Sequence, residues 1–166
     1  MQLPSSRATH TLIFIVCAGL MAVAFYMEFV KGFEPCPLCM AQRVAVVGVG
    51  LVALLAALHS PGKQGVRGYS IAMMFFSGLG IFLAGRQLWL QSLPEDLVPA
   101  CGPGIYYMLD AFPIGDTIRT MMMGSGDCAT VVWQDPVIGL SIPGWTFVWF
   151  IAMTLVALYQ FFRKAD

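Results

Sequence analysis

The chain has 166 residues, of which 58% are apolar and 11% charged, and its nine Lys and Arg residues are balanced by nine Asp and Glu. Soluble domains carry roughly 25% charged residues, so this chain lacks the polar surface that a water-soluble fold requires. It contains no basic run, which argues against a nucleic-acid-binding protein. The composition therefore indicates a protein whose solvent is the lipid bilayer.

Four apolar segments follow one another along the chain, at residues 11–30, 41–59, 69–90 and 144–163. Each is close to the ~20 residues that a helix needs to cross a hydrocarbon core of ~30 Å. Lipid offers no partners for backbone polar groups, so each segment is expected to be helical. Five glycines within these segments suit close helix packing in lipid, namely Gly48, Gly50, Gly78, Gly80 and Gly85.

These segments predict an all-α membrane protein, a four-transmembrane-helix bundle that forms a single domain over residues 1–166. Loops at 31–40 and 91–143 would lie on one side of the membrane, and a short loop at 60–68 on the other. The 91–143 loop is rich in Pro and Gly, which favours a long mobile arm with one short helix near 116–123, capped by Asp116. Residues 131–145 are mostly apolar and are expected to lie flat at the membrane interface.

The first segment has a competing interpretation as a cleaved signal peptide. Arg7 and His10 precede the apolar run, and residues 22–24 (Ala-Val-Ala) resemble a cleavage site. The apolar run continues to Val30, further than the apolar region of a signal peptide extends. This length favours a retained transmembrane helix.

Basic residues are distributed unevenly between the two sides. The termini and the 60–68 loop carry five of them, Arg7, Lys63, Arg67, Arg163 and Lys164. The opposite loops hold Lys31 and Arg119, with Arg43 and Arg86 near the membrane edge. The positive-inside rule therefore predicts that the termini lie in the cytoplasm and that the 31–40 and 91–143 loops lie on the opposite side of the membrane, which in a bacterium is the periplasm.

Four of the five cysteines, Cys36, Cys39, Cys101 and Cys128, fall in or beside these outward loops. Disulfides form and persist in the periplasm, and four cysteines admit three pairings. Spacing favours Cys36–Cys39 with Cys101–Cys128 without excluding the others. The fifth, Cys17, lies inside the first apolar segment and is interpreted as a small buried apolar residue.

Two inert structural disulfides in a non-enzymatic membrane protein are one interpretation of these four cysteines. A Cys101–Cys128 bridge, closing about 28 residues, could stabilise the fold by roughly 3–4 kcal/mol. A Cys36–Cys39 bridge closes a very short loop, so its value would lie in chemistry. Zinc is a weaker alternative because the second pair lacks knuckle spacing, and Met40 replaces the His that haem attachment requires. We predict no metal site.

The stretch FEPCPLCMAQR, residues 33–43, holds the C-x-x-C. Pro35 and Pro37 interrupt any helix upstream, so the cysteines are expected at a helix N-terminus, where the helix dipole favours a thiolate. Arg43 follows Cys39 by one helical turn on the same face. A charge near the hydrocarbon edge is a functional candidate, although an arginine there can also extend to the headgroups. Together these residues favour a redox site.

The C-P-L-C-x-x-x-R that opens the second helix, with LQSLPEDLVPACGPG and GSGDCATVVWQDPVIGLSIPGW further on, resembles the DsbB family of bacterial inner-membrane disulfide-bond formation proteins. The likeness spans residues 10–165. It implies a disulfide-generating thiol:quinone oxidoreductase that reoxidises a periplasmic thioredoxin-fold partner of the DsbA type. The DsbA–DsbB–quinone route is the established one that keeps the bacterial periplasm oxidising.

The resemblance also implies roles for the four cysteines. Cys101–Cys128 would be the loop disulfide that the partner's thiolate attacks, with Cys101 the sulfur that bonds to the partner in a mixed disulfide. Electrons would then pass to Cys36–Cys39, and Cys39 would face the quinone. Ubiquinone is the expected quinone, with menaquinone as the alternative.

Four further side chains are expected near the quinone by the same resemblance. Arg43 would stabilise negative charge on the thiolate and on the reduced quinone. Gln91 matches a glutamine that the family places there. Gln87 stands where some members have a histidine, so a role in proton delivery does not carry over to it, and Arg86 beside it is a further candidate.

Overall fold

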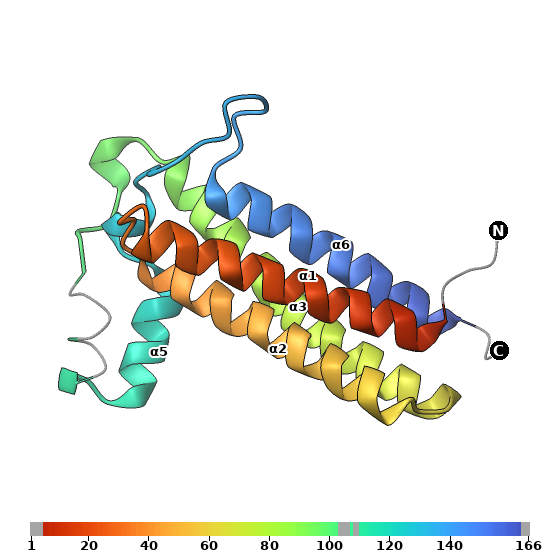
Figure 1. Ribbon diagram of the computed structural model, residues 1–166. Helices are drawn as coiled ribbons and strands as arrows, with labels where there is room; N and C mark the ends of the chain where they lie inside the picture. Colours follow the sequence, from red (N-terminus) through yellow and green to blue (C-terminus); the bar gives the residue numbers. More distant parts are fainter. Residues whose placement is uncertain (1–4, 103–106, 108–109, 164–166) are drawn as a thin grey trace.

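The computed structural model describes residues 5–102, 107 and 110–163. Its elements in chain order are α1 (Ser6–Phe29), α2 (Pro37–His59), α3 (Lys63–Gln91), the short 3-10 helix η1 (Glu95–Leu97), α5 (Ile114–Met123), the 3-10 helix η2 (Gly126–Cys128) and α6 (Ile142–Phe162). By length and composition, α1, α2, α3 and α6 could each cross a membrane. Figure 1 shows these four side by side, with the start of α1 and the end of α6 at the same end of the bundle. The predicted all-α four-helix membrane protein is confirmed.

The spanning helices begin earlier than their apolar segments. α1 begins at Ser6, and its N-cap Ser5 accepts a hydrogen bond from the Ala8 N–H (3.2 Å). α3 begins at Lys63, so the loop before it is residues 60–62 rather than 60–68. Hydropathy marks the part of a helix that lies in lipid, and a helix continues beyond it where water meets polar side chains. Lys164, counted above among the basic residues, lies outside the described residues.

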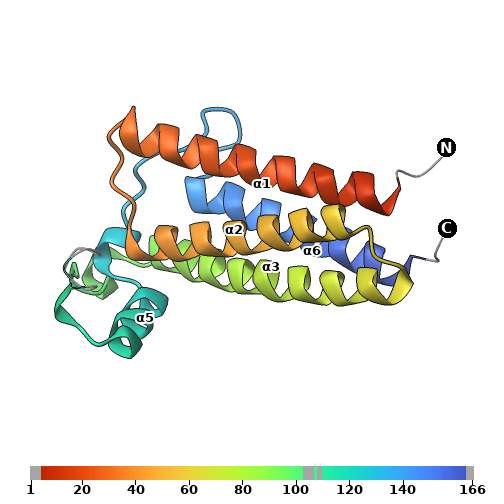
Figure 2. The ribbon, with the colours of Figure 1, turned by 60° about the horizontal axis from the view of Figure 1, so that its bottom comes forward.

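The helices pack in the order α1 on α2, α2 on α3 and α3 on α6. The core is formed by buried side chains from all four, including Ile13, Cys17, Val49, Ala53, Met73 and Phe150. Large apolar side chains on the outer faces, such as Leu12, Phe75 and Leu155, are more than half exposed. An outer surface of this kind suits lipid as the surrounding solvent. In Figure 2 the same bundle is seen from another side, with α5 beyond its end.

Two of the five glycines allow close approach of an aromatic ring. A Cβ at Gly48 would lie 2.5 Å from the Phe76 ring, and one at Gly80 would lie 2.4 Å from the Phe150 ring. Gly50 faces Cys17, at 3.1 Å. The expectation is wrong for Gly78, which is exposed and has nothing within 4 Å of its Cβ position.

The long loop folds back on the end of the bundle. The short helix predicted near 116–123 is confirmed as α5, but it begins at Ile114 with Pro113 as its N-cap, and Asp116 lies in its first turn. The extended backbone of Pro113 ends the preceding segment, and an acidic side chain in the first turn is favoured by the helix dipole. α5 packs against α2, and η2 packs against α2 and α3.

Residues 131–141 turn back on themselves ahead of α6, and their predicted place at the membrane interface stays a prediction. They form a narrow hairpin, closed by the Asp135 N–H to Leu140 carbonyl bond (2.9 Å), before α6 begins at Ile142. The Asp135 carboxylate accepts hydrogen bonds from the Val137 and Ile138 N–H groups at 2.7 and 3.1 Å. This Asx turn determines the local backbone in spite of the apolar composition.

Replacing Gly80 by Ala should destabilise the bundle, because the new methyl group would overlap the buried Phe150 ring. Overpacking of this kind costs about 1–3 kcal/mol. Gly78→Ala, two residues away on the outer face of the same helix, should leave stability unchanged or slightly raised. The free energy of unfolding in detergent, measured for both variants, checks this. Equal effects of the two changes would contradict the packing.

Candidate functional site

The C-x-x-C lies at the first turn of α2. Cys36 is the N-cap residue, with Pro37 following it in the first turn. Proline is favoured at this position because its backbone is already helical and its missing N–H is not needed there. The Cys36 sulfur accepts a hydrogen bond from the Cys39 N–H (3.4 Å), and the two sulfurs are 3.1 Å apart. The predicted place of the pair at a helix N-terminus is therefore confirmed.

A third sulfur reaches this turn from the distant loop. Cys128, on η2, is fully buried beside Leu38 and Leu90. The Cys36 thiol donates hydrogen bonds toward both Cys128 and Cys39, so Cys36 lies between two other sulfurs. We call Cys36, Cys39 and Cys128 the sulfur cluster. A central thiol of this kind can form a disulfide with either neighbour.

Hydrogen bonding shifts the pKa values of Cys36 and Cys128 in opposite directions. The bonds that Cys36 donates to Cys128 and Cys39, and its burial, raise the pKa of Cys36. The bond received from Cys36 lowers the pKa of Cys128 to about 6, against the opposing effect of burial, and the N–H groups of Leu38 and Ser125 act in the same direction. Cys128 is therefore stabilised as a thiolate, and a stable thiolate is a good leaving group in disulfide exchange.

Cys101 lies next to η2 but at the surface. Its segment packs against Gly126, whose N–H donates to the Ala100 carbonyl (3.2 Å) and whose Cβ position lies 2.4 Å from the Pro99 carbonyl oxygen. A hydrogen bond to the Asp127 carboxylate, together with its charge, raises the pKa of the exposed Cys101 thiol.

All five cysteines are free thiols in the structure, so the two predicted disulfide pairings stay predictions. Within the described part of the chain, no three His, Cys, Asp or Glu side chains form a group that could hold a metal ion.

A cavity of about 420 Å³ adjoins the sulfur cluster, with Cys39 in its wall. The helices α1 and α6 meet near the middle of the bundle, where the sulfurs of Cys17 and Met153 are 4.0 Å apart. Toward the cysteine end the cavity lies between them. Val23 on α1 and Trp149 on α6 line it, and both side chains are more than a third exposed. The cavity therefore opens between these helices on the side where lipid would lie.

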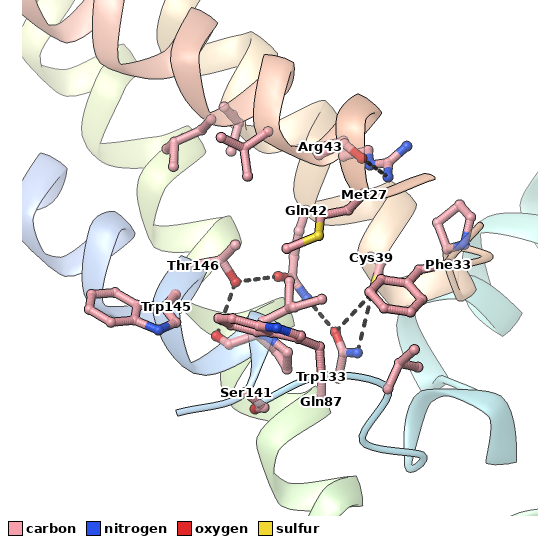
Figure 3. A pocket seen from close by; sticks show the side chains of 18 of the residues that line it. Met27, Phe33, Cys39, Gln42, Arg43, Gln87, Trp133, Ser141, Trp145 and Thr146 are labelled. Atoms are coloured by element: carbon pink, nitrogen blue, oxygen red, sulfur yellow. Dashed lines mark hydrogen bonds between the residues drawn. The ribbon is translucent and has the colours of Figure 1, made fainter. Parts of the chain in front are cut away.

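The cavity wall is mostly apolar, but a line of polar side chains crosses it (Figure 3). The Thr146 hydroxyl on α6 donates to Gln42 Oε1 on α2 (2.7 Å). Gln42 Nε2 donates to Gln87 Oε1 on α3 (2.7 Å). Gln87 Nε2 then donates to the sulfurs of Cys39 (3.3 Å) and Cys36 (3.4 Å). We call Thr146, Gln42 and Gln87 the amide chain. Both glutamines are buried.

Arg43 also lines the cavity, and its charge is paired inside the protein. Its guanidinium forms an ion pair with Glu28 of α1 and donates to the Ala24 carbonyl (3.3 Å). It also lies over the Phe25 ring, 5.6 Å from the centroid. The arginine is thus held beside the cavity by contacts with α1.

The two remaining candidates lie in different surroundings. Gln91 lines the cavity, and its Oε1 accepts a hydrogen bond from Ser141 (2.9 Å). Arg86 is not among the residues that line the cavity. Its guanidinium stacks on Trp89, 4.3 Å from the ring centroid, and donates to the carbonyl of Met123 at the end of α5 (3.2 Å). Arg86 therefore links α3 to the end of α5 in the long loop.

Sequence reasoning missed four side chains of this site, Glu28, Gln42, Trp145 and Thr146. Glu28 is an acidic residue in an apolar helix, and that alone is a signal for a functional or paired charge. Gln42 follows Cys39 by three positions, which places the two on one helix face. No sequence signal marked Thr146, because its partner lies 104 positions earlier in the chain.

Comparison with known proteins identifies the family of the chain. The family model of disulfide bond formation protein DsbB matches residues 6–160. Proteins named disulfide bond formation protein B are similar over nearly the whole chain. Those of Marinobacter nauticus (52% identical, covering 96% of this chain and 94% of the relative) and Hahella chejuensis (51%, covering 96% of each) are two examples. That of Saccharophagus degradans is 46% identical over 99% of this chain and 98% of the relative. The chain therefore belongs to the DsbB family of disulfide bond formation proteins.

Proposed function

We propose that the protein is a protein-dithiol:quinone oxidoreductase of the bacterial inner membrane. It reoxidises a periplasmic DsbA-type thioredoxin-fold protein and passes the electrons to ubiquinone or menaquinone. The observation that carries the proposal is that the sulfur cluster adjoins an apolar cavity that opens toward lipid, with Cys39 in the cavity wall. A water-borne thiol partner and a lipid-borne electron acceptor can meet only at such a boundary.

The exposed Cys101 supports the first exchange. With Cys101 and Cys128 joined as a disulfide, the partner's thiolate would attack the accessible sulfur, Cys101. The bond between Cys101 and Cys128 would break, and Cys128 would leave as a thiolate. The N–H groups of Leu38 and Ser125 favour this direction of attack, because they lower the pKa of the Cys128 thiol and do not depend on the redox state of Cys36. A mixed disulfide between Cys101 and the partner results, and the partner's second thiol resolves it.

The contact between Cys128 and Cys36 supports the second exchange. The Cys128 thiolate would attack Cys36 of the Cys36–Cys39 disulfide, forming a Cys36–Cys128 bond and releasing Cys39 as a thiolate at the cavity wall. Re-formation of the two original disulfides returns the protein to its starting state. Overall, one partner dithiol becomes a disulfide and one quinone becomes a quinol, with two electrons and two protons transferred.

The cavity suits a quinone headgroup. Its volume of about 420 Å³ is within the range of small-molecule sites. Trp145 lines it, and the indole N–H of Trp145 is buried and has no hydrogen-bond partner among the described residues. A quinone carbonyl is an acceptor that could satisfy this donor. Arg43 supplies positive charge beside Cys39, where negative charge would develop during electron transfer.

The test is quinone reduction by the purified protein in detergent, with a reduced DsbA-type protein as the electron donor. Wild type should turn over, and Cys39→Ser and Cys101→Ser should each abolish turnover, because each breaks the electron path. Cys17→Ala is the matched control, since Cys17 is buried against Met153 away from the cluster. If wild type reduces neither ubiquinone nor menaquinone and its disulfides survive the reduced partner, two inert structural disulfides become the better interpretation.

Arg43→Ala should lower quinone turnover by about tenfold or more, because a charge-assisted interaction is worth about 1.5–3 kcal/mol. Arg67→Ala is the matched control. Arg67 also lies over a phenylalanine ring, that of Phe161 (5.7 Å from the centroid), but it lies near the start of α3, whereas Gln87 of the site lies near the end of that helix. Steady-state kinetics with saturating partner will separate the two variants. Equal turnover in both would remove Arg43 from the proposed site.

The pKa of Cys128 should depend on Cys36. In reduced protein carrying Cys39→Ser and Cys101→Ser, the ultraviolet thiolate absorbance should titrate with a midpoint near the lowered value of about 6. Adding Cys36→Ala removes the hydrogen-bond donor, so the midpoint should rise toward the ordinary ~8.5 or above it. Adding Cys17→Ala instead should leave it unchanged. A midpoint that does not respond to Cys36→Ala would show that the two thiols are not in contact.

A further inference from the structure

The amide chain has a direction. A primary amide donates from its nitrogen and accepts at its oxygen, so a buried glutamine between two partners has two orientations with opposite polarity. Gln87 meets the sulfurs of Cys36 and Cys39 through its nitrogen, at 3.4 and 3.3 Å. In this orientation it donates to sulfur, and a thiolate accepts such bonds far better than a disulfide sulfur does.

Gln42 determines the orientation of Gln87. Gln42 Nε2 can only donate, and it lies 2.7 Å from Gln87 Oε1. The alternative partner of that oxygen, the Cys39 thiol, is 3.6 Å away. The short bond therefore keeps the oxygen of Gln87 turned to Gln42 and its nitrogen turned to the sulfurs.

Thr146 determines the orientation of Gln42 in turn. Its hydroxyl oxygen lies 2.7 Å from Gln42 Oε1, closer than to the Pro143 carbonyl of its own helix at 3.0 Å. A hydrogen bond donated here fixes the oxygen of Gln42 toward α6 and its nitrogen toward Gln87. The buried position of Gln42, which is 4% exposed, removes competition from water.

We infer that Thr146 and Gln42 are positioning residues, which hold the Gln87 amide so that it donates hydrogen bonds to the Cys39 sulfur and stabilises that cysteine in its reduced form. Neither needs to touch the quinone or the partner protein. The inference deepens the proposed function by naming what tunes the Cys36–Cys39 pair. It rests on that pair being redox-active, but its test requires neither quinone nor partner.

A second threonine provides a comparison. Thr154, two turns further along α6, also donates a hydroxyl bond to a neighbouring helix, to Ser77 Oγ of α3 (2.8 Å). That bond joins helices and leads to no sulfur. If Thr146 has a purely structural role, its replacement and that of Thr154 should affect reduction of the Cys36–Cys39 disulfide equally. If Thr146 is a positioning residue, only its replacement should change that equilibrium.

The test is the equilibrium between the Cys36–Cys39 disulfide and dithiothreitol at mildly alkaline pH, in full-length protein carrying Cys101→Ala and Cys128→Ala. In this background Cys36 and Cys39 form the one disulfide of interest. Thr146→Val, which keeps the shape and removes the hydroxyl, should make the disulfide harder to reduce, with an equilibrium constant about tenfold lower. Gln42→Leu should lower it at least as much. Thr146→Ser should restore the wild-type value, and Thr154→Val should leave it unchanged.

Thermal unfolding of each variant, measured in parallel, shows whether it is folded, and the serine variant keeps the test decisive even if Thr146→Val unfolds. An equilibrium constant equal to wild type in folded Thr146→Val would overturn the inference, as would a failure of Thr146→Ser to restore it or an equal shift in Thr154→Val. A protein that shows the expected shift but reduces no quinone would contradict the proposed function alone.

Discussion

The site depends on one hydrogen bond, from the Cys39 N–H to the Cys36 sulfur at the start of α2. Because α2 begins at Pro37, Cys36 becomes its N-cap and takes a position between Cys39 and Cys128. A helix that began one turn later, as the apolar pattern suggested, would leave both cysteines in an irregular loop. The first turn of α2 thus connects the loop sulfur on one side with the cavity on the other.

Polar groups near the cavity are placed by pairing across helices. Arg43 is held by Glu28 from α1, and Gln42 joins α6 to α3. In lipid, an unpaired polar group is costly, so such pairs restrict the relative positions of the helices. The two pairings hold different chemical groups for the proposed reaction. The ion pair with Glu28 holds the Arg43 guanidinium beside the cavity. The amide chain holds a neutral hydrogen-bond donor, the Gln87 amide, at the Cys39 sulfur.

Much of this arrangement could be predicted from the sequence, because the relevant signals are local. Hydropathy located four helices, and the prolines at 35 and 37 placed the C-x-x-C at a helix start. What could not be predicted depends on distant contacts, such as Thr146 with Gln42 and Cys128 with Cys36. Helix ends were also misplaced, because hydropathy ends where the lipid ends whereas backbone hydrogen bonding continues. In the 131–145 segment, the turn formed by Asp135 outweighed the apolar composition.

The opening of the cavity between Val23 and Trp149 has a kinetic consequence. A molecule that enters there diffuses in the two dimensions of the bilayer and never passes through water. The effective concentration of such a molecule is its ratio to lipid in the membrane. Diluting the membrane suspension with water leaves this ratio unchanged. Saturation of the site by such a molecule would follow the composition of the bilayer, whereas binding of the proposed thiol partner would depend on the partner's concentration in the aqueous compartment.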